Sequence, residues 1–230
     1  MTAIAANLQA VRDRIARAAH AARRSPDNIV LLAVSKTQPA ERVAQAHAAG
    51  QWAFGENTVQ EAVEKITKLV ALHHHLEWHF VGPIQSNKTA PIAVHFQWVH
   101  GVERARIAER LNSARPAGLP PLNVCIQVNV SGEASKSGVE PGGEIELAGI
   151  ISRLPRLKLR GLMAIPEPTT DIALQRRRFA LLRELKDGLA ARGHALDTLS
   201  MGMSDDFEAA IAEGATIVRV GTAIFGSRIR

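Results

Sequence analysis

The sequence predicts an α/β fold: a single closed (β/α)8 barrel over residues 1–230, with an additional helix before the first strand. A chain of 230 residues falls in the usual range for one such barrel. Eight short apolar runs alternate with helical patterns, and no strand-rich block or break in composition divides the chain. An open doubly wound sheet is the alternative, but its dinucleotide-binding form requires G-x-G-x-x-G after the first strand, where residues 35–38 are SKTQ.

The elements follow in order from the spacing of apolar residues. Ile4, Leu8, Val11 and Ile15 recur at helical spacing and predict an amphipathic helix over residues 3–22. The apolar run 29–34 then predicts a strand buried on both faces, and a helix over 39–49 ends at Gly50. The remaining strands are predicted at 52–54, 78–81, 96–99, 124–130, 159–164, 198–200 and 216–220.

Charge and composition argue against a nucleic-acid partner. A net charge of +6 and a pI near 10.1 suit phosphate binding, but the basic residues are spread along the chain. The densest run, 176–178, is flanked by apolar residues at helical spacing, which indicates the solvated face of an amphipathic helix. Aromatic residues make up only 4% of the chain and tyrosine is absent, so surfaces for base stacking are scarce.

We expect a cytoplasmic protein without a membrane partner. No apolar stretch approaches the roughly 20 residues that span a bilayer, and the first helix mixes arginines with alanines. The single cysteine, Cys125, cannot form an internal disulfide, in agreement with a reducing compartment. Because Cys125 lies in the apolar run 124–130, we interpret it as a core residue and not as a nucleophile.

Functional residues of such barrels lie at the carboxyl ends of the strands, and this rule selects Lys36. Lys36 comes directly after the buried run 29–34, so its side chain can extend over the barrel mouth. Partial desolvation there would favour a neutral amine that can react with a carbonyl group. Position alone leaves open the alternative of a strand-end lysine that reaches into solvent.

The same rule selects the loops after strands seven and eight, where such barrels commonly bind phosphate. Residues 200–206 and 219–226 carry glycines that allow close approach of backbone N–H groups, while Ser200 and Thr222 offer hydroxyls. Thr222 is also placed to begin a short helix, whose N-terminus favours an anion. The alternative is ordinary turn and helix-capping chemistry.

Three other patterns give weaker signals. Residues 82–89, GPIQSNKT, are close to a phosphate-binding P-loop, but Asn87 stands where that motif requires glycine. Histidines 73–75 are consecutive without further ligands at suitable spacing, so we predict no metal site. Glu56 and Glu61, interpreted as residues of one helix, would not face one another and are assigned as helix-entry charges.

Seven segments in order resemble one protein family nearly from end to end. They are AVSKT at 33–37, FGENTVQE at 54–61, WHFVGPIQSNK at 78–88, QVNVSGEASKSG at 127–138, RGLMAI at 160–165, LSMGMSDDFEAAI at 199–211 and VRVGTAIFG at 218–226. These segments resemble the pyridoxal phosphate homeostasis family, the YggS-like and PROSC-like proteins, whose barrel is similar to the N-terminal domain of alanine racemase. Thr58 is a departure, since the family usually has tyrosine at this place.

The resemblance implies pyridoxal 5′-phosphate (PLP) as cofactor, bound as a Schiff base on Lys36. It further implies that Asn57 lies beside the cofactor ring and that Arg219 faces the pyridine nitrogen. A permanent cation there would disfavour protonation of that nitrogen and weaken the ring as an electron sink. A strand-end salt bridge is the alternative role of Arg219. The residues implied to hold the phosphate are Ser200, Gly202, Gly221 and Thr222.

Lys136 is a candidate for a second PLP lysine. It lies in a loop rich in glycine and serine after the fifth predicted strand, so its amine is placed to reach the same barrel mouth as Lys36. An exposed loop lysine without function is the alternative.

The expected function is PLP homeostasis: storage, buffering or delivery of the cofactor, with apo forms of PLP-dependent enzymes as recipients. A racemase needs two acid/base groups on opposite faces of the cofactor. In alanine racemase, which the barrel resembles, the second group is a tyrosine from another domain, whereas this sequence has no tyrosine and ends at Arg230 soon after the eighth predicted strand. We therefore expect a monomer without catalytic residues. A weak amino-acid racemase is the alternative function, and a plain interaction module would bind no chromophore.

Overall fold

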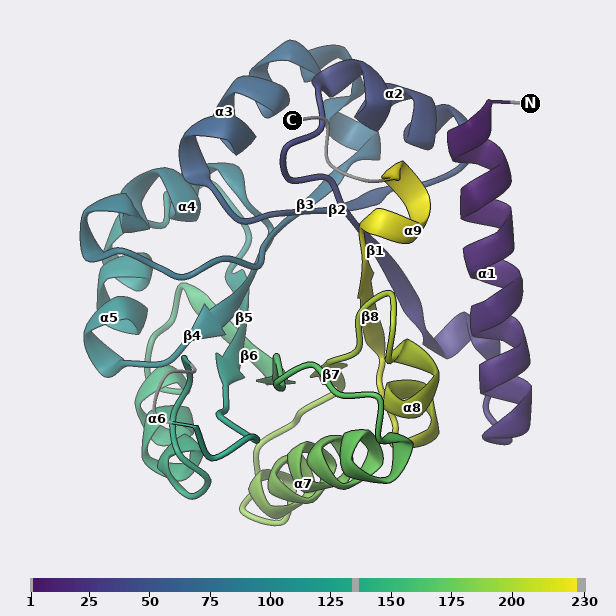
Figure 1. Cartoon of the computed structure of the whole chain (residues 1–230). Helices are drawn as coiled ribbons and strands as arrows, with labels where there is room; N and C mark the ends of the chain where they lie inside the picture. The colour runs from purple at the N-terminus through teal and green to yellow at the C-terminus, as the bar shows by residue number, and fades with distance from the viewer. Residues whose placement is uncertain (1, 134–136, 227–230) are drawn as a thin grey trace.

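The structure, a computed structural model, describes residues 2–133 and 137–226 and shows a closed barrel of eight parallel strands ringed by helices (Figure 1). The strands pair in chain order, and β8 closes the barrel against β1. The predicted (β/α)8 barrel is thereby confirmed. The strands are β1 (Val30–Val34), β2 (Ala53–Glu56), β3 (Glu77–Phe80), β4 (Trp98–Val102), β5 (Leu122–Gln127), β6 (Leu157–Met163), β7 (Thr198–Ser200) and β8 (Ile217–Val220).

Helices lie between successive strands and cover the outside of the barrel (Figure 1). The α-helices are α1 (Ala3–Ala21), α2 (Ala40–Ala48), α3 (Val59–Lys68), α4 (Thr89–His95), α5 (Ala105–Ala114), α6 (Gly143–Ile151), α7 (Ile172–Ala190), α8 (Phe207–Ala212) and α9 (Thr222–Phe225). Short 3-10 helices are η1 (Pro26–Asn28), η2 (Val70–His75) and η3 (Ser86–Lys88). None of the described helices is long and apolar enough to cross a membrane.

All eight predicted strands are present, but several boundaries differ. The strand expected at 96–99 begins at Trp98, because Phe96 instead ends α4 and packs edge-on against Phe80 with ring centroids 5.3 Å apart. The strand expected at 124–130 begins at Leu122 and ends at Gln127. The strand expected at 52–54 continues to Glu56, which changes the environment of that carboxyl group.

The core has two parts, as expected for strands buried on both faces. The larger part lies between the strands and the surrounding helices, whereas the smaller part lies inside the barrel. Its buried members are Leu32, Ala53, Trp98, Cys125, Met163 and Ile217. Burial raises the pKa of the Cys125 thiol to about 12, so the prediction that Cys125 is a core residue is confirmed.

The first helix, α1, packs against α2, α8 and α9 on the outside of the β8–β1 seam (Figure 1). Leu8 is fully buried in this contact, and the Asn7 side chain donates a hydrogen bond to the Ile224 carbonyl (3.0 Å). Arg14 pairs with Glu208 of α8 at 2.7 Å. α1 therefore supports the last strand and the last helix of the barrel.

The basic run 176–178 lies on α7, as the sequence predicts. Phe179 and Leu182 are buried beneath this helix, while Arg176 pairs with Glu213 at 2.7 Å and Arg178 with Glu167 at 3.4 Å. The prediction of an amphipathic helix is confirmed.

Candidate functional site

A cavity of about 390 Å³ opens at the carboxyl ends of the strands, lined by loops that follow β1, β2, β3, β6, β7 and β8. Strands of a parallel barrel all end at the same face, so residues far apart in the sequence meet here. Five of the predicted site residues line this cavity: Lys36, Asn57, Arg219, Gly221 and Thr222. Ser200 and Gly202 are not among the residues that line it, and Lys136 falls outside the described residues.

Lys36 lies in a tight turn after β1, and a side chain of α3 holds the backbone of this turn. The next residue, Thr37, has φ 63°, a left-handed conformation that is uncommon for a β-branched residue. Its N–H donates to Glu61 Oε1 at 2.6 Å, which holds this conformation in place. The lysine therefore sits on a turn that a neighbouring helix, α3, keeps in one shape.

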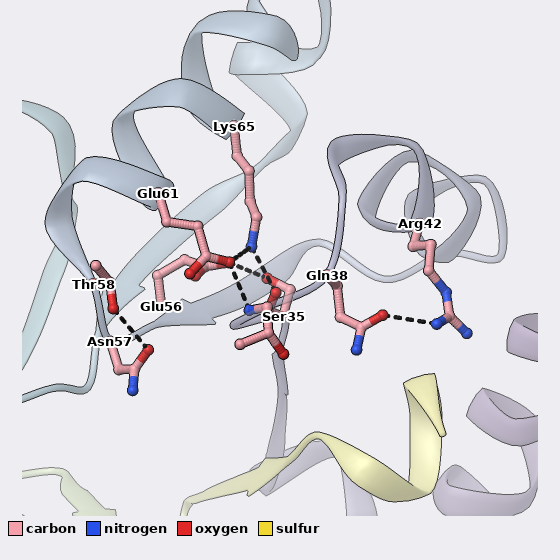
Figure 2. Close-up of polar contacts among 9 residues, drawn as sticks. Ser35, Gln38, Arg42, Glu56, Asn57, Thr58, Glu61 and Lys65 are labelled. Carbon is pink, nitrogen blue, oxygen red and sulfur yellow. Dashed lines mark hydrogen bonds and ion pairs between the residues drawn. The ribbon is translucent and has the colours of Figure 1, made fainter. Parts of the chain in front are cut away.

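A buried charge cluster, formed by Ser35, Glu56, Glu61 and Lys65, supports this turn (Figure 2). The Lys65 ammonium donates to Glu56 Oε1 at 2.8 Å, to Glu61 Oε1 at 2.6 Å and to the Ser35 carbonyl at 2.6 Å. The assignment as a helix-entry charge is confirmed for Glu61, which lies in the first turn of α3, and is wrong for Glu56. Glu56 lies in β2, not in the helix, so its carboxylate and that of Glu61 both reach Lys65.

The electrostatics of Glu56 follow from its burial. Desolvation raises the pKa of this carboxyl group above its ordinary value, and Lys65 and the Ser35 hydroxyl, which donates to Oε1 at 2.6 Å, act in the opposite direction. Within the described part of the chain, Glu56 Oε2 has no hydrogen-bond partner. The ionised form of Glu56 therefore depends on Lys65.

Arg219 lies in β8 with its guanidinium at the inner edge of the cavity and is 4% exposed. It donates to Ser200 Oγ at 2.7 Å and to the Ala164 carbonyl at 2.8 Å. Burial lowers the pKa of Arg219 to about 10, so the side chain is still a cation at neutral pH. In the described ranges no carboxylate lies within ion-pair distance of Arg219, so nothing there supports the alternative of a strand-end salt bridge.

The Ser200 hydroxyl points into the barrel and not into the cavity. Ser200 is the last residue of β7, and its Oγ lies 2.7 Å from Arg219 Nη1 and 2.7 Å from His100 Nδ1. Ser204, four residues later in the same loop, lines the cavity instead. Sequence reasoning missed Ser204, although its place beyond the strand end was a usable signal.

Two glycines let backbone segments approach closely around the site. Gly202 has φ +91°, and a Cβ there would lie 2.6 Å from the Ala210 Cβ. At Gly82 a Cβ would lie 2.3 Å from the Asn57 carbonyl oxygen, so glycine is needed for the loop after β3 to lie against Asn57. These glycines shape the cavity wall through packing.

Hydrogen bonds connect the short helix α9, which begins at Thr222, with the loop after β1 on the opposite side of the site. Gln38 lines the cavity and accepts a hydrogen bond from Arg42 at 2.7 Å (Figure 2). Arg42 also donates to the Phe225 carbonyl at 2.6 Å. The loop after β1 and the helix after β8 are thus joined through one arginine.

The fold and site define a barrel of the racemase type with a lysine at its mouth, and a family model for the N-terminal domain of alanine racemase matches residues 3–229. A pyridoxal phosphate homeostasis protein of Pseudomonas aeruginosa is 62% identical over 228 residues, covering 99% of this chain and 97% of the relative. One from Escherichia coli is 55% identical over 232 residues, covering 99% and 98%. The chain belongs to the family of pyridoxal phosphate homeostasis proteins.

A solved structure of a related protein supports this family assignment. PipY of Synechococcus elongatus, determined with PLP bound, superimposes with a TM-score of 0.84 at 36% sequence identity. The match covers 97% of this chain and 100% of that one.

Proposed function

We propose that this chain binds PLP in the cavity at the barrel mouth and acts in PLP homeostasis by storing, buffering or delivering the cofactor. The observation that carries the proposal is the convergence of Lys36, Arg219 and Thr222 on one cavity from opposite ends of the sequence. The PLP bound to the related PipY supports the identity of the ligand.

The groups around the cavity fit the chemistry of PLP. An aldehyde requires an amine, which Lys36 supplies. A phosphate requires N–H and O–H donors on glycine-containing backbone, which Gly221, Thr222 and Ser204 supply. A pyridine nitrogen accepts a hydrogen bond, and the Arg219 guanidinium can only donate.

Each residue then has a proposed role. Lys36 holds the cofactor through a Schiff base, and Asn57 lies beside the ring. Arg219 donates to the pyridine nitrogen and, as a lasting cation, disfavours its protonation. Thr222 and Gly221 hold the phosphate, and Gly202 shapes their neighbouring loop. Because the Ser200 hydroxyl is bonded to Arg219, we propose that Ser200 acts through that arginine and that Ser204 takes its place at the phosphate.

The ionisable groups also favour a carrier over an enzyme. Among the described residues, the ionisable ones that line the cavity are Lys36, Asp205 and Arg219. Arg219 stays protonated, and no tyrosine exists in the sequence to act as the second acid/base group of a racemase. We propose that the protein acts in the cytoplasm as a monomer and passes PLP to apo-enzymes without turning over amino acids.

The binding proposal is tested by reconstitution with PLP followed by borohydride reduction and peptide mapping. We expect a yellow protein with the reduced adduct on the peptide containing Lys36, and at least a tenfold loss of that adduct in Lys36→Ala. Lys88→Ala is the matched control, since Lys88 is exposed and does not line the cavity. A colourless protein, or an adduct confined to another peptide such as that of Lys136, would overturn the assignment.

The functional proposal needs two further assays. Holo-protein mixed with an apo PLP-dependent enzyme should restore activity to that enzyme. Incubation with a panel of L- and D-amino acids should leave their configuration unchanged. Steady-state racemisation that disappears in Lys36→Ala would establish the alternative of a weak racemase.

A further inference from the structure

A chain of buried polar groups crosses the barrel interior and ends on Arg219. His79 of β3 and His100 of β4 are 1% and 0% exposed, and His79 Nδ1 lies 2.9 Å from His100 Nε2. His100 Nδ1 lies 2.7 Å from Ser200 Oγ, which accepts from Arg219 Nη1 at 2.7 Å. At the other end, His79 Nε2 lies 2.8 Å from Glu77 Oε1, at the amino end of β3.

The two ends together fix the direction of the bonds in this chain when both rings are neutral, because the Glu77 carboxylate can only accept and the Arg219 guanidinium can only donate. A guanidinium can only donate, so Ser200 Oγ accepts from Arg219 and its own hydrogen is left for His100 Nδ1. With Nδ1 accepting, a neutral His100 carries its hydrogen on Nε2 and donates to His79 Nδ1. His79 in turn donates from Nε2 to the Glu77 carboxylate. Each imidazole has one donor and one acceptor, and both are used.

The surroundings of the two histidines agree with neutral rings. Burial lowers the pKa of His100 well below its ordinary 6.5, and the nearby His79 and Arg219 lower it further. Burial also lowers the pKa of His79, against the opposing effect of Glu77. Trp98 stacks on the His79 ring at 5.3 Å with an interplanar angle of 6°, which fixes its plane.

The chain therefore links a cation at the cavity to an anion at the opposite end of the barrel through neutral groups of fixed polarity. We propose that Glu77, His79 and His100 are positioning residues that act through Ser200 to hold the Arg219 guanidinium in one orientation. Ser200 Oγ and the Ala164 carbonyl occupy two of the five N–H donors of Arg219. The others are left to a ligand in the cavity, which under the proposed function is the pyridine ring of PLP.

The first test needs no ligand. Long-range ¹H–¹⁵N NMR spectra of the ligand-free protein at pH 7 should show two histidines as neutral rings with hydrogen on Nε2. Signals are assigned by their loss in His79→Gln and His100→Asn. A protonated ring, or hydrogen on Nδ1 of either residue, would contradict the proposed donor and acceptor of each hydrogen bond.

The second test rests on the proposed function and uses PLP labelled with ¹⁵N in the ring. His100→Asn, which breaks the link to His79, and Ser200→Ala, which breaks the link to Arg219, should weaken PLP binding about fivefold or more. Both should also shift the ring ¹⁵N resonance, an effect that a general loss of stability would not produce. His20→Gln, on the exposed surface of α1, is the control and should change neither value.

The outcomes separate the two proposals. Wild-type protein that binds no PLP overturns the proposed function, while the tautomers measured without ligand still decide the direction of the chain. If PLP binds and the tautomers are as expected, but His100→Asn and Ser200→Ala leave both affinity and ring resonance unchanged, the positioning role is overturned.

Discussion

At the scale of single residues, the loop after β7 depends on Gly202 for two separate reasons. Its φ is +91°, and a Cβ would lie 2.6 Å from Ala210 Cβ and 2.9 Å from Phe207 Cα. Gly202→Ala should lower the free energy of unfolding by about 2–4 kcal/mol, from the left-handed backbone and the clash together. Urea denaturation measures this loss.

Gly193 provides a matched control for that substitution. It has the same φ of +91°, but a Cβ at this position would have no heavy atom of the described residues within 4 Å. Gly193→Ala should therefore cost only the backbone strain, about 1–2 kcal/mol. Equal losses for both variants would show that the close packing at Gly202 does not matter.

The buried charge cluster makes Lys65 the second sensitive residue. Its side chain is 6% exposed and neutralises Glu56, whose side chain is fully buried. Lys65→Met should destabilise the fold by about 3–5 kcal/mol, because it leaves a buried carboxyl group without its cation. Adding Glu56→Gln to this variant should recover part of the loss in urea denaturation. A double variant less stable than Lys65→Met would contradict this explanation.

What the sequence could predict of the site depended on the chain position of each residue. Lys36 and Thr222 come two residues after the ends of β1 and β8, so the strand-end rule was sufficient to place them at the cavity. Ser200 ends a strand, and which way its side chain points depends on the pleat of β7. His79 and His100 meet inside the barrel through strand register, which spacing along the sequence does not reveal.

At the scale of elements, α1 contributes to the barrel although it lies outside the repeating strand–helix units. Leu8, fully buried between α1 and its neighbours, should cost about 2–5 kcal/mol when replaced by alanine. Gln9→Ala is the control, since Gln9 is exposed and should change the stability by no more than about 0.5 kcal/mol. Thermal and urea unfolding of both variants measure the difference, and similar stabilities would exclude a supporting role for α1.

Element boundaries explain the incorrect assignment of Glu56. Apolar periodicity ends β2 at Phe54, because Gly55 and Glu56 give no apolar signal. The strand nevertheless continues through both residues, since they pair with His79 and Phe80 of β3. A buried carboxylate is compatible with this extension only because Lys65 reaches it from α3. The apolar periodicity of the sequence around Glu56 gives no sign of that tertiary contact.

At the scale of the whole molecule, the number and order of the strands were predictable, whereas the filling of the barrel was not. Eight apolar runs with helices between them favour closure over an open sheet. The interior combines an apolar group around Leu32 and Trp98 with the polar chain from Glu77 to Arg219. Which strand supplies which interior residue follows from register and stagger, and neither is encoded by composition.

The two buried histidines should make the stability of the whole fold depend on pH. Their pKa values are lowered on folding, so below about pH 6.5 the unfolded chain binds protons that the native state does not. Lowering the pH from 7.5 to 5.5 should therefore reduce the free energy of unfolding, by at most about 3 kcal/mol if both rings stay neutral in the folded protein. Urea denaturation at several pH values measures this slope.

Glu56 affects the pH dependence of the stability in the opposite direction to the histidines. The raised pKa of Glu56 makes the native state hold a proton more tightly, which favours the fold as the pH falls. The same titration in Glu56→Gln removes this effect and leaves the two histidines opposed only by Asp206, the other described carboxyl group whose pKa burial raises. A stability that stays constant or rises between pH 7.5 and 5.5 in that variant would contradict neutral buried rings.

The closure of β8 on β1 also sets a time order during synthesis. Lys36 leaves the ribosome early, but Gly221 and Thr222, on the other side of the same cavity, are added among the last residues of this sequence. At typical translation rates the interval is roughly ten to forty seconds. A nascent chain therefore carries the amine long before it has the opposite wall, so the complete cavity forms only after Thr222 has been added.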